Sequence, residues 1–313
     1  MKKIIAILLA AALLFGFAGC AKNNKNSTDS AAVSVVCTIF PQYDFLRAIT
    51  KDVESTEVKM LLAPGDESHS YSASLEDISL IKNADLFVYV GGESDEWVDE
   101  VLKTASPKKA IALVELVKTL EESDDGILAK EEEEEEAGAA DEHVWTSPAN
   151  AAAIIDKLAQ TMAEIDSANA ETYRKNAAAY SAQFKDLDEK FQTFFAGVKN
   201  KTIVIADRNP FRYFCDAYGI KAIAAFSGCS SNNEIPLSVQ NELIKAIQTN
   251  GLKYVYVIEL NTSSYADAIA AQTGAQKLTL NSCHNLSKED FESGKTFLEM
   301  MTENYDTLSA SMK

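Results

Sequence analysis

Short apolar runs alternate with longer amphipathic stretches along the chain, and each run has the length of a buried strand. In the first half these runs are VSVVCTIF (33–40), STEVKMLLA (55–63), the end of LEDISLIKNADLFVYVGG, and AIALVEL (110–116). Buried strands that alternate with helices are typical of a parallel α/β sheet. The first half of the chain therefore predicts one α/β lobe, over residues 33–165.

The second half repeats this order, which predicts another α/β lobe over residues 201–313. Its apolar runs are KTIVIAD (201–207), IKAIAAF (220–226), LKYVYVIEL (252–260) and AQKLTLN (275–281). Between the halves, residues 149–199 are rich in Ala, Lys, Glu and Gln, with apolar residues at helical spacing and a break near Asp166. We therefore expect two α/β lobes with parallel sheets, joined by a long linking helix within 166–200.

The N-terminus has a different pattern. Two lysines, an apolar run and two small residues lead to Cys20, which is typical of an export signal over 1–19. A retained anchor helix is the alternative. A cysteine after small residues resembles the lipobox of bacterial lipoproteins, where it receives the lipid. Residues 20–32 are polar and predict a flexible tether. We expect an exported protein, lipid-anchored through Cys20 to the outer face of the cytoplasmic membrane.

The chain is strongly acidic, with a formal net charge of −18 at pH 7. Such a surface repels nucleic acid and attracts cations, so we expect no nucleic-acid partner. Residues 121–142 include the run Glu131–Glu136 and have few apolar side chains. They predict a mobile surface loop, either simply solvated or acting as a weak cation collector.

Two of the three histidines, His69 and His143, lie in similar surroundings. Each stands in a loop that follows a predicted strand and precedes a helix start, at Ser74 and at Ser147 respectively. Parallel α/β sheets bind ligands at that edge. Either histidine alone is more often structural, but the pair favours metal ligation, because neutral imidazole is a common ligand of zinc and manganese.

Two stretches resemble signatures of a known family. PGDESHSYSASLEDISLIKNADLFVYVGG and DEHVWTSPANA are similar to the two N-lobe signatures of the zinc/manganese solute-binding proteins of ABC importers, generally lipid-anchored in Gram-positive bacteria. The resemblance implies a metal cleft between the lobes, with His69 and His143 as its N-lobe ligands. It also implies delivery of a divalent transition metal to an ABC permease. Zinc is expected over manganese from the Irving–Williams order, and we expect a monomer.

The C-terminal half departs from the pattern of that family. Arg208 stands where relatives have a metal-ligating His or Glu, and Asn281 where they have Asp. An arginine stays protonated and cannot ligate a cation. Glu234, in FSGCSSNNEIP, is the first choice for a third ligand. The weaker candidates, each with an ordinary structural alternative, are Asp207, Cys229 and His284.

Two further questions concern the class of protein and its cysteines. A secreted metal-dependent hydrolase is disfavoured, because the sequence contains no HExxH or GxSxG motif. A degenerate family member that binds a different ligand or acts as an adhesin is the main alternative, since an arginine in a cleft suits an anion or a chelated metal. The pairing of the cysteines besides Cys20 stays open; these are Cys37, Cys215, Cys229 and Cys283.

Overall fold

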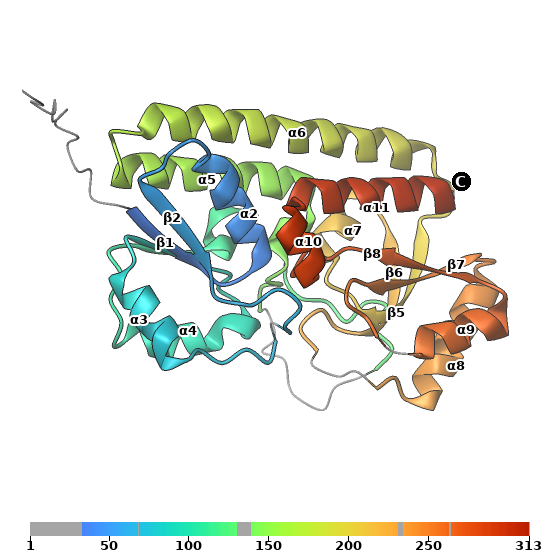
Figure 1. The fold of residues 1–313 in the computed structure, drawn as a ribbon. Helices are drawn as coiled ribbons and strands as arrows, with labels where there is room; N and C mark the ends of the chain where they lie inside the picture. The colour runs from blue at the N-terminus through green and yellow to red at the C-terminus, as the bar shows by residue number, and fades with distance from the viewer. Residues whose placement is uncertain (1–32, 68, 130–138, 231–233, 263, 313) are drawn as a thin grey trace, which may run out of the picture. The chain divides into compact units, whose positions relative to one another are not determined.

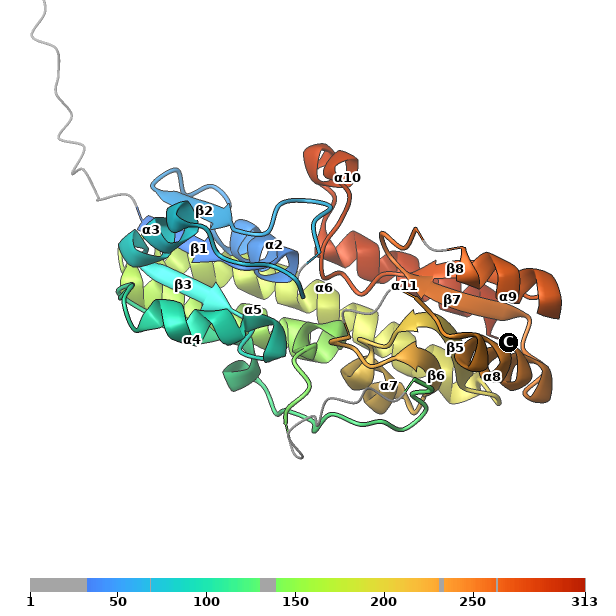
Figure 2. The same ribbon diagram turned by 90° about the horizontal axis from the view of Figure 1, so that it is seen from below.

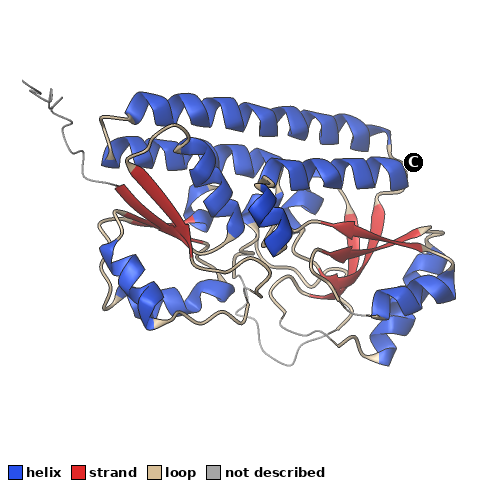
Figure 3. Cartoon of the chain, in the orientation of Figure 1, coloured by secondary structure: helices blue, strands red, loops and turns tan. Residues whose placement is uncertain are grey.

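Two parallel β-sheets, each with its own helices, organise the folded part of the chain (Figure 1; Figure 3). The computed structural model describes residues 33–67, 69–129, 139–230, 234–262 and 264–312. Each sheet has four strands, and every neighbouring pair is parallel. The predicted fold class, two α/β lobes with parallel sheets, is confirmed.

The N-terminal sheet has the strand order β2-β1-β3-β4. Its strands are β1 (Val33–Cys37), β2 (Thr56–Met60), β3 (Leu86–Tyr89) and β4 (Ala110–Ala112). The connecting helices are α2 (Phe40–Ile49), α3 (Leu75–Asn83) and α4 (Glu96–Leu102). The central strands β1 and β3 are mostly buried, as expected for apolar strands of a parallel sheet that is covered on both faces.

The C-terminal sheet repeats the arrangement with the order β6-β5-β7-β8. Its strands are β5 (Thr202–Arg208), β6 (Lys221–Phe226), β7 (Tyr254–Ile258) and β8 (Gln276–Leu280). The connecting helices are α7 (Arg212–Tyr218), α8 (Leu237–Thr249) and α9 (Tyr265–Thr273). Two helices follow the last strand, α10 (Lys288–Ser293) and α11 (Phe297–Ser311).

Two long helices, α5 (Pro148–Ile165) and α6 (Ala170–Gly197), connect the lobes. The break falls at Asp166, whose carboxylate accepts a hydrogen bond of 2.9 Å from the Tyr173 hydroxyl. Helix α6 contacts α2 in the first lobe and both α7 and α11 in the second, and Figures 1 and 2 show it extending across both lobes. One apolar cluster runs from β1 through the buried face of α6 to α11, so the two lobes share a core.

Both helix starts that the sequence predicted near the histidines are present. Ser74 caps α3 by accepting a hydrogen bond from the Asp77 amide, and the Asp77 carboxylate in turn accepts one from the Ser74 amide. Ser147 caps α5 by accepting from the Asn150 amide, with proline at the first helical position. These caps satisfy backbone donors that a helix start leaves open, and they fix where the preceding loops end.

The acidic segment differs from its prediction. Residues 126–129 run along the edge strand β6, where the amide of Leu128 donates to Ala224 O over 3.0 Å and the amide of Ala129 donates to Ala225 O over 2.9 Å. Ile127 and Leu128 pack on the hydrophobic core. A mobile loop over the whole of 121–142 is therefore wrong for its described ends. Glu131–Glu136 lie outside the described residues.

The predictions for the N-terminus are not tested by the structure, whereas the question of the cysteine pairing is answered for the described residues. The signal peptide 1–19, Cys20 and the tether 20–32 lie outside the described residues. Among the helices that the structure describes, none is long and apolar enough to cross a membrane. The four cysteines of the described ranges are in no disulfide; these are Cys37, Cys215, Cys229 and Cys283.

Candidate metal centre

His69 lies in the loop between β2 and α3, and its side chain is nearly buried, with 6% exposed. Its Nδ1 atom lies 2.9 Å from Oε1 of Glu67, and the same carboxylate oxygen accepts a hydrogen bond of 3.2 Å from the His69 amide. Its other ring nitrogen, Nε2, lies 3.8 Å from Oε1 of Glu142. The ring is therefore held at one nitrogen and directed inward with the other.

His143 lies directly before the short 3₁₀ helix Val144–Thr146 and is fully buried. Its Nδ1 atom is 3.3 Å from Oδ1 of Asp141, and its amide donates to the same oxygen over 2.8 Å. Within the described residues, His143 Nε2 is buried and has no hydrogen-bond partner. A buried polar nitrogen without a partner is costly, and a metal ion would satisfy it.

The two histidines repeat one local arrangement. In each case an acidic residue two positions earlier, Glu67 or Asp141, contacts both the Nδ1 atom and the backbone amide of the histidine. Metal-ligating histidines commonly donate their second ring nitrogen to a carboxylate, which fixes the tautomer and the ring orientation. The repeated spacing, acidic residue-x-His, is present in the sequence and was a signal for these positioning carboxylates that our sequence analysis missed.

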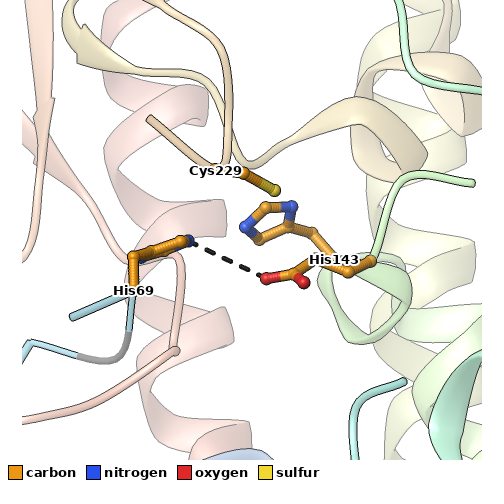
Figure 4. A group of neighbouring side chains, drawn as sticks. His69, His143 and Cys229 are labelled. Atoms are coloured by element: carbon orange, nitrogen blue, oxygen red, sulfur yellow. Dashed lines mark ion pairs between the residues drawn. The ribbon is translucent and has the colours of Figure 1, made fainter. Parts of the chain in front are cut away.

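Four side chains converge at this point. The potential ligand atoms of His69, Glu142, His143 and Cys229 all lie within 4.8 Å of one another. Figure 4 shows the two imidazoles and the Cys229 thiol directed toward the same small volume, with the His69–Glu142 ion pair dashed. We call these four residues the metal cluster. Sequence analysis missed Glu142, because it appeared to be one more residue of an acidic segment.

Glu142 is buried, and a backbone amide of the first lobe fixes its carboxylate. Its Oε2 atom accepts a hydrogen bond of 2.9 Å from the amide of Ser94, just after β3. Its Oε1 atom is buried with no hydrogen-bond partner in the ranges that the structure describes. One oxygen therefore orients the carboxylate, and the other faces the imidazole of His69.

The third histidine, His284, also reaches this region, on the loop after β8. Its ring centroid lies 5.0 Å from that of His69 and 5.7 Å from that of His143. Burial, followed by the two neighbouring histidines, lowers the pKa of His284 well below its ordinary value. It is therefore a neutral imidazole beside the metal cluster, although it is not one of the four residues within 4.8 Å.

Protons and a metal ion would compete for this cluster. Burial lowers the pKa of His143, but Asp141 and Glu142 outweigh it, so the pKa stands above its ordinary value. Burial, and then Glu142, raise the pKa of the Cys229 thiol. Both groups hold their protons more firmly than free side chains do. A metal ion would have to displace these protons when it binds.

The site is built from the carboxyl ends of strands in both sheets. His69 follows β2, and Gly92, which packs on Glu142, follows β3. In the second lobe, Cys229 follows β6 and His284 follows β8. Parallel α/β sheets bind ligands at this end, so the fold brings together residues that are distant in sequence.

The remaining predicted ligands have other positions. Glu234 is exposed and lies outside the metal cluster. Asp207 lines the adjoining cavity, but its carboxylate accepts hydrogen bonds from the amides of Arg208 and Ile258. Asn281, which was not predicted to be a ligand, is directed toward α11, where it donates to Met300 O. Of the C-lobe candidates, the structure thus brings Cys229 and His284 to the histidines.

A cavity of about 360 Å³ adjoins His69, His143 and His284. Its wall carries more acidic than basic side chains. The charged residues that line it are Asp66, Glu67, Asp207, Glu259 and Arg208. Such a wall favours a cation over an anion. Next to it, Glu93 and Glu122 lie with Cys229 in a second group whose ligand atoms are within 4.8 Å of one another.

Close approach to the cluster requires glycine at two positions. A Cβ atom at Gly228 would lie 2.8 Å from Cε1 of the His143 ring, and one at Gly92 would lie 2.3 Å from Cβ of Glu142. Both distances are shorter than van der Waals contact. These two backbone segments therefore pack directly on two side chains of the metal cluster.

Replacing Gly228 by alanine should weaken metal binding by about tenfold or more, because the added methyl group displaces the His143 ring and misplaced ligands lose affinity. Calorimetric zinc titration measures the effect. Gly197→Ala is the matched control, since a Cβ atom there meets no atom within 4 Å. Equal zinc affinity in the two variants would show that the His143 ring is not constrained by Gly228.

Comparison with known proteins identifies the family. The model of the family described as "ZnuA: Zinc-uptake complex component A periplasmic" matches residues 35–311. The chain belongs to the ZnuA family. The resemblance that the sequence predicted, to metal solute-binding proteins of ABC importers, is confirmed by this match.

Two zinc-related proteins and one solved structure are similar to this chain in sequence or fold. The chain is 30% identical to the high-affinity zinc uptake system protein ZnuA of Bacillus subtilis, over 99% of this chain and 98% of that protein. It is 29% identical to the zinc-binding lipoprotein AdcA of Streptococcus pneumoniae, over 98% of this chain but only 60% of AdcA. The crystal structure of the Zn(II)-bound ZnuA-like domain of that AdcA superposes with a TM-score of 0.75, at 26% identity, over 90% of this chain and 98% of that domain.

Proposed function

We propose that this protein is an extracytoplasmic zinc receptor that captures the ion at His69, Glu142, His143 and Cys229. The observation that carries the proposal is the convergence of their ligand atoms within 4.8 Å, in a largely buried position. Two imidazoles, a carboxylate and a thiol suit zinc, whereas calcium and magnesium prefer shells of oxygen alone. The thiol also favours zinc over manganese. His284 stands beside this set as a neutral imidazole.

The receptor would act as a monomer and pass the captured zinc to an ABC permease. Membership in the ZnuA family and the similarity to the zinc uptake protein of Bacillus subtilis support this step. Lipid attachment at Cys20 would keep the receptor at the outer face of the cytoplasmic membrane, close to the permease. The activity is binding and transfer rather than catalysis.

Zinc titration of the chain from Cys20 onward tests the proposal. Zinc should bind at one site per chain, more tightly than manganese and far more tightly than magnesium. Glu142→Gln should weaken zinc binding by about 10–100-fold, the cost expected when a supporting or ligating carboxylate is lost. The exposed carboxylate Glu234 provides the matched control, and Glu234→Gln should bind like the wild type.

Two outcomes would count against this function. A wild-type chain that binds no zinc would favour the alternative, a family member that binds a different ligand or acts as an adhesin. If Glu142→Gln binds zinc like the wild type and Glu234→Gln binds it more weakly, the third ligand is Glu234, as the sequence alone suggested. Transfer to a permease requires in addition that cells lacking the protein take up zinc more slowly when zinc is scarce.

A further inference from the structure

Two side chains of the C-terminal lobe donate hydrogen bonds to the loop that carries His69. Arg208, the last residue of β5, donates from Nη2 to Oε2 of Glu67 over 2.7 Å and from Nη1 to Oε1 over 3.2 Å. Asn285, after β8, donates from Nδ2 to the carbonyls of Ala63 and Asp66 over 2.9 and 2.8 Å. The N-lobe loop that contains His69 is thus held by C-lobe side chains at two places: Asn285 binds its first part, and Arg208 binds Glu67 beside His69.

Glu67 links the Arg208 contact to the imidazole of His69. The oxygen that accepts from Arg208 Nη1 is the same Oε1 that lies 2.9 Å from His69 Nδ1. Nη1 of Arg208 lies 3.1 Å from the same His69 Nδ1, so Arg208 and Glu67 together hold this ring nitrogen. The other ring nitrogen, Nε2, is the atom that lies 3.8 Å from Glu142. The Arg208–Glu67 pair therefore determines which nitrogen of His69 is offered to a metal.

Arg208 and Glu67 form an ion pair, with Nη2 of Arg208 2.7 Å from Oε2 of Glu67. A guanidinium stays protonated in proteins, so the positive partner of this pair is always present. Arg208 is only 8% exposed and donates to Ser230 O over 3.1 Å, so its own position is fixed.

We propose that Arg208 is a positioning residue through which the C-terminal lobe controls zinc affinity: Arg208 fixes Glu67, and Glu67 fixes His69. The proposal rests on the zinc-binding function proposed above. An arginine cannot ligate zinc, so its contribution is made entirely through these two hydrogen-bonded neighbours.

This arrangement also links release to movement of the lobes. The bidentate Arg208–Glu67 contact joins the two lobes, and so do the hydrogen bonds of Asn285. If the lobes separate, Glu67 loses its fixed position and His69 loses its enforced orientation. The ion is then held by fewer oriented ligands. Opening should therefore speed zinc release.

Zinc affinity and zinc release rate, measured with a competing chelator, test the proposal. Arg208→Gln and Glu67→Gln should each weaken zinc binding by about 10–100-fold, as loss of supporting contacts around a metal site does. The double variant should lose little more than either single variant, because both remove the same link. Arg208→Lys should fall between wild type and Arg208→Gln, since it keeps the charge without the bidentate geometry.

A control separates this effect from the general loss of an ion pair. Lys185→Gln removes the exposed pair of 3.2 Å with Asp156, and it should leave zinc affinity and release unchanged. The absorption spectrum of the cobalt-substituted protein provides a second readout, because it reports ligand geometry and not stability. It should change in Glu67→Gln and stay unchanged in Lys185→Gln.

Several results would overturn the proposal. Wild-type zinc affinity and release in either Arg208→Gln or Glu67→Gln would do so, as would losses that simply add in the double variant. If Arg208→Gln does not fold, Glu67→Gln decides alone, since the Glu67 side chain is 42% exposed and its loss leaves no large void. A wild-type protein that fails to bind zinc would instead refute the proposed function.

Discussion

Replacing His143 by alanine should weaken zinc binding by at least about 100-fold. Loss of a contact that merely orients a metal ligand costs about 10–100-fold, and here the ligand itself is removed. The ring is fully buried, with Nδ1 fixed by Asp141 and Nε2 facing the metal cluster. Calorimetric titration with zinc, at a pH near 7.5, measures the loss.

The pH dependence of wild-type affinity is a second part of this test. Zinc takes the lone pair that a proton would occupy. The pKa of His143 is raised, because Asp141 and Glu142 outweigh burial, so protons begin to compete at a higher pH than for a free imidazole. Affinity should therefore fall as pH is lowered, and the fall should be shallower in His143→Ala. Unchanged zinc affinity in a folded His143→Ala protein would exclude His143 as a ligand.

Replacing Trp145 by alanine should lower the free energy of unfolding by about 3–5 kcal/mol, the range for truncating a large buried aromatic side chain. Trp145 is fully buried, and its Nε1 atom donates to Ser282 O over 3.0 Å. Its ring lies 5.4 Å from that of His143 and 5.0 Å from that of His284. The same change should therefore also weaken zinc binding. Urea unfolding of the metal-free protein measures the first effect.

The other tryptophan provides the control for this prediction. Trp97 is only partly buried, so Trp97→Ala should cost less stability and leave zinc affinity near that of the wild type. Trp145→Phe should cost about 1 kcal/mol, since it keeps most of the packing but leaves the Ser282 carbonyl without its donor. A loss for Trp145→Ala no larger than that for Trp97→Ala would contradict the role of Trp145 as a core residue behind the site.

Local patterns in the sequence were sufficient for the fold. All eight predicted strands are present, and the helix starts at Ser74 and Ser147 have the expected caps. These features depend on residues close together in the chain, where hydrophobic period and capping chemistry act directly. The same reasoning placed His69 and His143 on loops at the binding edge, and the structure brings their rings together.

The carboxylates of the site could not be predicted in this way. Glu142 belongs to a segment whose other acidic residues appear equivalent in sequence, and only the position of Ser94, distant in the chain, turns it inward. Glu234 has a plausible place after a strand, yet it is exposed. Which carboxylate faces the histidines depends on contacts between loops of different strands, and the charge pattern of one segment contains no information about those contacts.

The stretch 126–129 occupies the outer edge of β6 and so protects one side of the second sheet from other chains. An open strand edge is a template on which another chain can add, and proteins avoid aggregation by covering such edges. Residues 126–129 cover this one with the protein's own backbone. A protease cut on the C-terminal side of this stretch would leave it attached at one end only. The nicked protein should then expose the edge of β6 and self-associate more readily than the intact chain.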